Sequence, residues 1–114
     1  MAHIGGNITG QFQICTVKKN RMGEGEKTWE DAVNQLGYLD LQSGDSKYSN
    51  FNAKIEESTH IFLCDFNSAL YALSSSDARV IFKGMVYDVL LIDNPMEMNE
   101  HLEIYLRKVG AWNG

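Results

Sequence analysis

The residues of this chain that could carry chemistry are its histidines, cysteines and aspartates. The three histidines and two cysteines share no metal-ligand spacing with one another: His3, His60, His101, Cys15 and Cys64. The sequence also contains no serine elbow, no cysteine–histidine signature and no Walker loop. We therefore expect no catalytic residue, no metal site and no cofactor.

Two weaker patterns have simpler explanations than catalysis. Asp65, Asp88 and Asp93 fall near the ends of expected strands, where paired carboxylates could exchange protons but where aspartate more often closes a turn. The Gly-x-Gly sequence at residues 23–25 lacks the third glycine and the following helix of a phosphate-binding loop. Neither pattern predicts an enzyme.

Length and charge limit the classes of protein further. The chain has 114 residues and a formal net charge of −5, which predicts one domain and argues against a nucleic-acid-binding face. Its basic cluster, Lys18, Lys19 and Arg21, is expected at the solvated end of a hairpin and is a candidate partner contact. An acidic wall would still let DNA slide past without sticking.

The first residues of the sequence and its two cysteines indicate the expected cellular compartment. The first residues have neither the charged nor the apolar region of a secretion signal, and no apolar run is long enough for a membrane helix. We therefore expect an intracellular context, in which Cys15 and Cys64 are buried free thiols.

The elements that must position these residues are clearest in residues 77–108. Three short runs there are rich in β-branched, aromatic or alternating apolar residues: 79–83, 85–92 and 101–107. In the last run, apolar residues alternate strictly with polar ones: Leu102, Ile104 and Leu106. The pattern predicts an antiparallel meander with a tight corner at Gly84 and a longer polar connection over residues 94–100.

The first half of the chain has a less regular pattern. Three further runs are expected to be strands: residues 11–18, 38–42 and 60–66. Residues 20–27 are expected to form a flexible acidic loop. Residues 28–36 fit either a two-turn helix or a strand, and we favour a strand or irregular segment at Trp29, broken by Gly37.

The remaining segments connect or extend these strands. Residues 43–58 form a long polar loop, either loosely attached to the surface or ordered only against neighbouring subunits. Residues 68–73 are expected to place one helical turn over an open end of the core. Residues 1–9 should be loosely ordered, and residues 109–114 a tail whose Trp112 either packs back on the domain or anchors a partner.

Together these elements predict an all-β protein. Five or six antiparallel strands with short turns and no long helix form a small β-barrel or sandwich with one long inserted loop. The chain is then a single domain over residues 1–114.

The same stretches resemble the head closure and head–tail adaptor proteins of long-tailed bacteriophages. The resemblance rests on the Arg-Val-Ile-Phe strand and Lys-Gly corner at residues 79–84, followed by Tyr87-Asp88-Val89, Ile92-Asp93 and a leucine-rich last strand. Upstream, a polar hairpin followed by Thr28-Trp29 occurs at the matching place.

This resemblance implies a virion structural protein and not an enzyme. Such subunits form a ring, expected to be dodecameric, on the portal side of the head–tail connector after DNA packaging. The ring closes the DNA channel and offers a platform to which tail components dock. Subunits would be monomers alone in the bacterial cytoplasm, and DNA would pass through the ring without sequence-specific binding. By position, residues 43–57 correspond to the loop that points into the channel, with these candidate residues: Asp45, Lys47, Tyr48, Phe51 and Ile55.

Two other functions stay open. Within the same class, the chain could be the neighbouring adaptor or the tail-terminating ring component, although the strong last meander favours head closure. From another class, it could be a stand-alone intracellular β-barrel that binds a small ligand or peptide in an apolar pocket.

Overall fold

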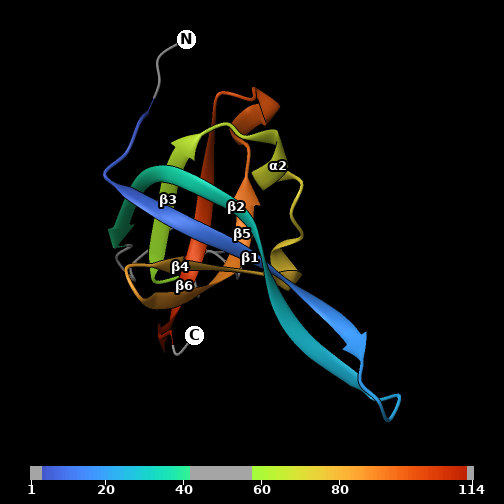
Figure 1. The fold of residues 1–114 in the computed structure, drawn as a ribbon. Helices are drawn as coiled ribbons and strands as arrows, with labels where there is room; N and C mark the ends of the chain where they lie inside the picture. The colour runs from blue at the N-terminus through green and yellow to red at the C-terminus, as the bar shows by residue number, and fades with distance from the viewer. Residues whose placement is uncertain (1–3, 42–57, 113–114) are drawn as a thin grey trace.

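A computed structural model describes residues 4–41 and 58–112 of the chain. Within this part, six antiparallel strands form a closed barrel in the order β1-β2-β3-β6-β5-β4 (Figure 1). The strands are β1 (Ile8–Lys19), β2 (Gly25–Leu41), β3 (His60–Asp65), β4 (Ala78–Phe82), β5 (Met85–Asp93) and β6 (His101–Ala111). The prediction of a small all-β antiparallel barrel is therefore confirmed, whereas the predicted loop over residues 43–57 lies outside the described residues.

Strands β4, β5 and β6 form the predicted meander. The corner between β4 and β5 is tight, with Lys83 and Gly84 both at positive φ (48° and 79°). The connection from β5 to β6 is longer and contains a short 3₁₀ turn, η3 (Pro95–Glu97). On β6, every second residue from Leu102 to Leu106 is fully buried, so the expected face of this strand is confirmed.

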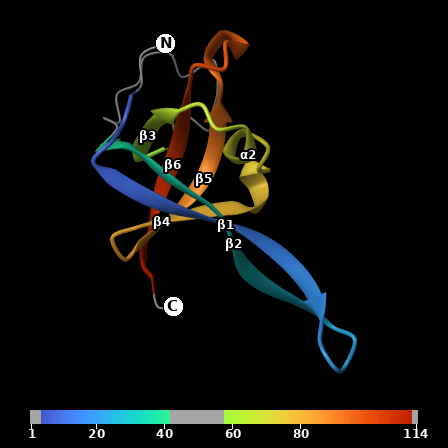
Figure 2. The same ribbon diagram turned by 45° about the horizontal axis from the view of Figure 1, so that its top comes forward.

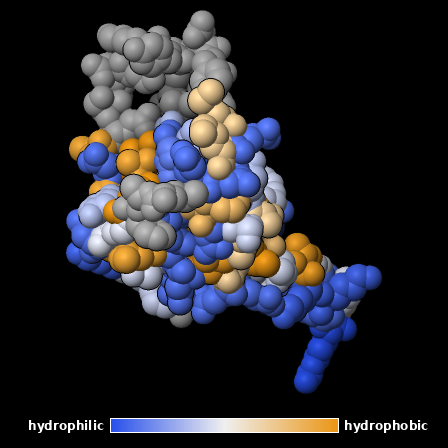
Figure 3. Space-filling view, turned by 90° about the horizontal axis from the view of Figure 1, so that it is seen from above, coloured by the Kyte–Doolittle hydropathy of each residue, from blue (hydrophilic) through white to orange (hydrophobic). Residues whose placement is uncertain are grey.

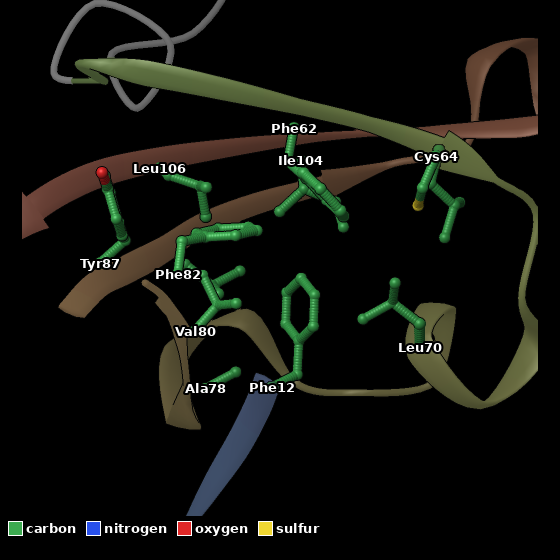
Figure 4. Close-up of a cluster of buried hydrophobic side chains, with 12 residues drawn as sticks. Phe12, Phe62, Cys64, Leu70, Ala78, Val80, Phe82, Tyr87, Ile104 and Leu106 are labelled. Carbon is green, nitrogen blue, oxygen red and sulfur yellow. The ribbon is translucent and has the colours of Figure 1, made fainter. Parts of the chain in front are cut away.

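The barrel interior is filled by aromatic and aliphatic side chains (Figure 4). The ring centroids of Phe62 and Phe82 lie 4.9 Å apart, and those of Phe12 and Phe62 lie 6.0 Å apart, distances typical of favourable aromatic pairs. Leu70, from the one-turn helix α2 (Ser68–Tyr71), is fully buried against the same cluster. Asn67 caps this helix by accepting from the N–H groups of Ala69 and Leu70. The predicted helical turn over the core is thus confirmed.

One break predicted from the sequence is wrong. Strand β2 runs through Gly37, which pairs with Ile8 of β1 on one side and Cys64 of β3 on the other. A Cβ at Gly37 would lie 2.5 Å from the Leu63 carbonyl oxygen and 2.6 Å from the Phe62 ring. The glycine is required by close approach to β3 and does not end a strand.

Three segments expected to be loose instead belong to strands. Residues 25–27 lie in β2 because they pair with the end of β1, and residues 109–111 lie in β6 because Gly110 and Ala111 pair with the start of β5. Residues 8 and 9 begin β1, and the N–H groups of Ile4 and Gly5 donate to the Asp65 carboxylate at 2.7 and 3.3 Å. In each case a partner strand or side chain, distant in sequence, supplies the hydrogen bonds that order the segment.

Both cysteines are free thiols on different strands, but only Cys64 is buried and Cys15 is half-buried. Burial, and then the nearby Asp65 carboxylate, raise the pKa of the Cys64 thiol from its ordinary 9.0 to about 12. Burial likewise raises the pKa of the Tyr105 hydroxyl from 10.0 to about 12, with Glu103 adding to the effect. Both groups are therefore held neutral in the folded protein.

We expect the free energy of unfolding to fall as the pH rises from about 9 toward about 12. The unfolded thiol ionises near its ordinary pKa while the folded thiol does not, so the unfolded state gains stability over this range. Urea denaturation of wild type and Cys64→Ala between pH 8 and 11.5 measures this. The decline should be shallower in the variant, and equally steep curves would show that the Cys64 thiol does not contribute.

None of the helices in residues 4–41 and 58–112 is long and apolar enough to cross a membrane.

Candidate assembly surface

A two-stranded arm projects from the barrel (Figures 1 and 2). Strand β4 pairs with residues 11–14 of β1, and β3 pairs with residues 37–41 of β2. Beyond these contacts, residues 15–30 continue as a hairpin whose outer edges pair with no other described strand. We call residues 15–30 the arm. Its β1 half spans five residues, or about 17 Å of strand.

The base of the arm is fastened to the barrel by a stacked pair. The Arg79 guanidinium of β4 lies over the ring of Trp29, 4.3 Å from the ring centroid. Trp29 stands directly opposite Cys15 on the outer face of the arm. Burial lowers the pKa of Arg79, although Asp88 nearby opposes this effect, so the guanidinium is partly withdrawn from water.

A row of polar side chains continues from this pair around the outer face of the barrel. Each member stands opposite the next on neighbouring strands: Asp31, Gln13, Arg79, Asp88 and Arg107. The buried Gln13 amide donates from Nε2 to Asp31 Oδ1 (2.9 Å) and accepts at Oε1 from Arg79 Nε (2.8 Å). Arg107 Nη2 donates to Asp88 Oδ2 at 3.1 Å. Hydrogen bonds from Gln13 and then Gln11 lower the pKa of Asp31.

This polar row gives the arm a defined direction. A two-stranded ribbon alone is marginally stable in water, but here its base is joined by the polar row to three further strands, β4, β5 and β6. On the face of the arm opposite to Trp29, the hydroxyl groups of Thr16 and Thr28 form a hydrogen bond of 3.0 Å. Lys18 Nζ lies 3.0 Å from Glu30 Oε1. The arm is therefore a preformed projection from the barrel.

A groove of ≈ 360 Å³ lies beneath the arm base on the outside of the barrel. It is lined by residues of the arm, of the 3₁₀ turn η2 (Ser75–Asp77) and of three strands: Trp29, Ser75, Ser76, Ala78, Asp88, Val89, Leu90 and Arg107. Leu90 faces the groove at a bulge, where the register of β5 against β6 shifts between Val89 and Leu91. The groove offers one tryptophan ring and two opposite charges, which suits a peptide segment or a neighbouring chain more than a reacting small molecule.

The arm ends in a tight turn. The Asn20 side chain accepts from the N–H groups of Met22 (2.9 Å) and Glu24 (3.1 Å), and Gly23 supplies a φ of +81°. The predicted flexible acidic loop over residues 20–27 is thus a short turn fixed by one asparagine. It presents Arg21 and Met22 to solvent, and the Met22 side chain is 81% exposed. Figure 3 shows this tip as a hydrophilic projection from the barrel.

A second fixed turn connects β5 to β6, and we call residues 94–100 the β5–β6 turn. The buried Asn94 holds it by exchanging two hydrogen bonds with Asn99, at 2.7 and 3.1 Å. Met96, Glu97 and Asn99 all have positive φ, between 54° and 56°. Asparagine tolerates this conformation, but residues such as Met96 and Glu97 rarely adopt it. Such strain persists where the surroundings determine it and is typical of binding sites. The turn exposes Met96 (88%), Met98 and the Glu97 carboxylate.

The structure separates the four partner contacts expected from the sequence. Lys18, Lys19 and Arg21 lie together at the exposed end of the arm, as the hairpin prediction required. Trp112 lies elsewhere, just after β6. Its backbone N–H donates to the Gly84 carbonyl at 2.8 Å, and the residue stays partly exposed. The five candidates of the channel loop, residues 45–55, lie outside the described residues.

Within the described residues, no group of three or more histidine, cysteine or acidic side chains could hold a metal ion. Two of the three carboxylates singled out earlier have structural partners: Asp65 accepts from the N–H groups of Ile4 and Gly5, and Asp88 pairs with Arg107. The third, Asp93, stands opposite Glu103 of β6.

Among the described residues, a hydroxyl does lie beside a histidine ring nitrogen: Thr59 Oγ1 is 2.9 Å from His60 Nδ1. The Thr59 hydroxyl also accepts from the Lys108 backbone N–H at 2.9 Å, which gives it a structural role between β3 and β6.

Three features were not predicted from the sequence: the Trp29–Arg79 stack, the polar row and the strained β5–β6 turn. The first two join strands that are distant in sequence, so only the register brings them together. For the turn, a signal was present in the apolar Met96 and Met98 among the polar residues of the connection.

Comparisons with known proteins identify the fold. No family model matches the chain, and no curated protein matches it. The chain is similar to the solution structure of protein SF1141 from Shigella flexneri 2a, with a TM-score of 0.68 and 19% sequence identity. The match covers 95% of this chain and 96% of that one. At this identity, the likeness shows a shared fold over nearly the full length of both chains.

Proposed function

We propose that this chain is a virion structural protein of the head–tail connector of a long-tailed phage. Copies form a ring that closes the DNA channel after packaging and provides the docking platform for the tail. The proposal rests on the resemblance of the β4–β5–β6 meander and the Thr28-Trp29 hairpin to that family, together with one structural observation, the arm.

The arm supports an assembly role because none of its side chains packs in the core of its own barrel. Its residues contribute none of the side chains of the buried cluster, yet its base is fixed by the Trp29–Arg79 stack and the polar row. Exposed strand edges invite pairing with another chain, and proteins that do not use them usually shorten or cover them. A long preformed hairpin with open edges is therefore best explained by a partner that it contacts.

The charge of the molecule is compatible with a DNA channel. The net charge of −5 gives a ring of such subunits a wall that repels the polyanion, so DNA would pass without being held. Isolated subunits should remain monomers and join the ring only on the portal or adaptor surface, where neighbours are at high effective concentration.

A ligand-binding or peptide-binding module is the second candidate, and the groove beneath the arm favours it. The barrel interior is filled by Phe12, Phe62 and Phe82, which leaves the outer groove as the place for an occupant within the described residues. Its open position beside the arm also suits a neighbouring subunit, which is the interpretation we prefer. A peptide module would bind its ligand as an isolated monomer.

Deleting this chain from the phage or prophage that encodes it should leave free tails and packaged heads that do not join, and the heads should lose DNA because their channel is not closed. Adding purified wild-type protein to the mixed heads and tails should restore joining, which electron microscopy and plaque titre measure. A variant whose arm is replaced by a short Gly-Ser turn between residues 14 and 31 should fold but fail to restore joining. Complete, infectious particles from the deletion strain would contradict the proposal.

A further inference from the structure

The two fixed turns of this molecule carry opposite charge. The arm tip has three cationic residues within four positions, Lys18, Lys19 and Arg21, which outnumber the neighbouring acidic residues Glu24 and Glu26. Lys18 already lies 3.0 Å from Glu30 Oε1, so Lys19 and Arg21 are the cations that the tip presents to a partner. The β5–β6 turn contributes Glu97 and Glu100, and the flanking strand ends add Asp93 and Glu103, which stand directly opposite each other. The arm tip therefore has a net positive charge, and the β5–β6 turn with its flanking strand ends has a net negative charge.

Both turns also present an exposed methionine on a backbone that is already ordered. Asn20 fixes the tip around Met22, and Asn94 fixes the β5–β6 turn around Met96 and Met98. A flexible apolar side chain beside like charges is typical of a contact surface that adapts to a partner. Because both backbones are preformed, little conformational entropy would be lost when they meet.

The two turns cannot meet within one molecule. In both ribbon views the arm tip and the β5–β6 turn lie at opposite ends of the structure (Figures 1 and 2). The polar row and the Trp29–Arg79 stack hold the arm directed away from the barrel. A contact between them therefore requires two copies.

We infer that the arm tip of one copy docks on the β5–β6 turn of the next copy, head to tail. Lys19 and Arg21 lie against Glu97 and Glu100, and Met22 lies against Met96 and Met98. Such a contact uses two different surfaces of each subunit, so repetition generates a ring when the rotation closes. The inference rests on the proposed function in naming a ring, and it adds which surfaces make the ring.

The acidic side has a local reason to accept a cation. Asp93 and Glu103 stand directly opposite each other on β5 and β6. Burial, and then the Glu103 carboxylate, raise the pKa of Asp93, while His101 opposes the effect. The Glu103 carboxylate accepts from Tyr105 at 3.2 Å and lies 3.1 Å from His101 Nε2. A lysine or arginine from a second copy would relieve the remaining repulsion. Exposed ion pairs are individually weak, which agrees with a contact that is transient between free copies and becomes stable when a template aligns them.

Site-directed cross-linking of purified protein tests the contact. In a Cys15→Ser background, one copy carries Met22→Cys and the other Met96→Cys, and a short bismaleimide joins them at high protein concentration and low salt. The control partner carries Leu41→Cys, a position 72% exposed and far from the turn in sequence. We expect the 22–96 heterodimer to form roughly tenfold faster than the 22–41 heterodimer. Equal rates would overturn the inference.

Exchanging the charges of the two surfaces gives a second test. Lys19→Glu with Arg21→Glu on the tip copy should reduce 22–96 cross-linking roughly tenfold, and so should Glu97→Lys with Glu100→Lys on the turn copy. Combining the two exchanged copies should restore the rate, because attraction returns with opposite sign. Loss without restoration, or no loss at all, would overturn the contact.

Failure here is distinguishable from failure of the proposed function. Cross-linking uses purified protein and requires no virus, whereas the joining assay requires no knowledge of which surfaces meet. Joining that depends on this chain without 22–96 cross-linking would retain the connector role and reject this contact. Cross-linking without any joining defect would retain the contact and reject the connector.

Discussion

The Ile104→Asp variant is expected to be unfolded. Ile104 is fully buried on β6 within the aromatic and aliphatic cluster, opposite Phe62 of β3. Losing an apolar side chain of this size from a core lowers the free energy of unfolding by about 2–5 kcal/mol. Burying an unpaired carboxylate in its place lowers it further by several kcal/mol. Small domains have only about 5–15 kcal/mol of stability in total. Far-ultraviolet circular dichroism and urea denaturation should show no cooperative transition.

Val109→Asp is the matched control on the same strand. The Val109 side chain is 60% exposed, so the same charge there should change the free energy of unfolding by less than about 0.5 kcal/mol. A folded, soluble Ile104→Asp protein with a normal transition would contradict the face that we assign to β6.

Gly37→Ala should destabilise the barrel by about 1–3 kcal/mol or more. The added Cβ would lie 2.5 Å from the Leu63 carbonyl oxygen and 2.6 Å from the Phe62 ring. The carbonyl belongs to the paired β3 backbone, which cannot move aside without breaking its ladder. Thermal denaturation should therefore show a melting temperature lowered by several degrees, on the order of 4–8 °C for each kcal/mol.

Gly25→Ala provides the control for Gly37→Ala. At Gly25 the nearest atom to a new Cβ is Val17 Cγ1, at 3.1 Å, the end of a side chain on the open arm. The melting temperature should change little, and an equal loss at both glycines would show that close approach to β3 is not the cause.

Sequence patterns determined the barrel where contacts are local or periodic. The alternation of Leu102, Ile104 and Leu106 gave the buried face of β6, and the Lys83-Gly84 corner gave the β4–β5 hairpin. The turn over the core was identified from apolar residues near Leu70. In each case a few neighbouring residues contain the whole signal.

The errors occurred where a distant partner decides the structure. Gly37 has the residue type of a strand break, but its neighbours Ile8 and Cys64 hold it inside β2. Gly110 and Ala111 have no strand signature of their own and are ordered by β5. At such positions the pairing with a neighbouring strand outweighs the intrinsic β-propensity of the residue, because strand formation depends on the strand alongside.

Less of the candidate surface was predictable. The sequence indicated the basic cluster at residues 18–21 and placed it at a hairpin end, which the structure confirms. It gave no sign that Arg79 would stack on Trp29, fifty residues earlier in sequence, because that pair depends on two registers at once. The direction of the arm, and hence the surface that it can reach, follows from this pair.

Under the proposed function this chain is part of a phage head–tail junction, and electron cryomicroscopy of that junction tests the central proposal most directly. A ring of density at the junction should accept the six-stranded barrel in every subunit, with the arm of each copy extending to its neighbour. The arm tip should then lie against the neighbouring β5–β6 turn. A junction whose density is fully occupied by other proteins, leaving no ring that fits this barrel and arm, would contradict the assignment.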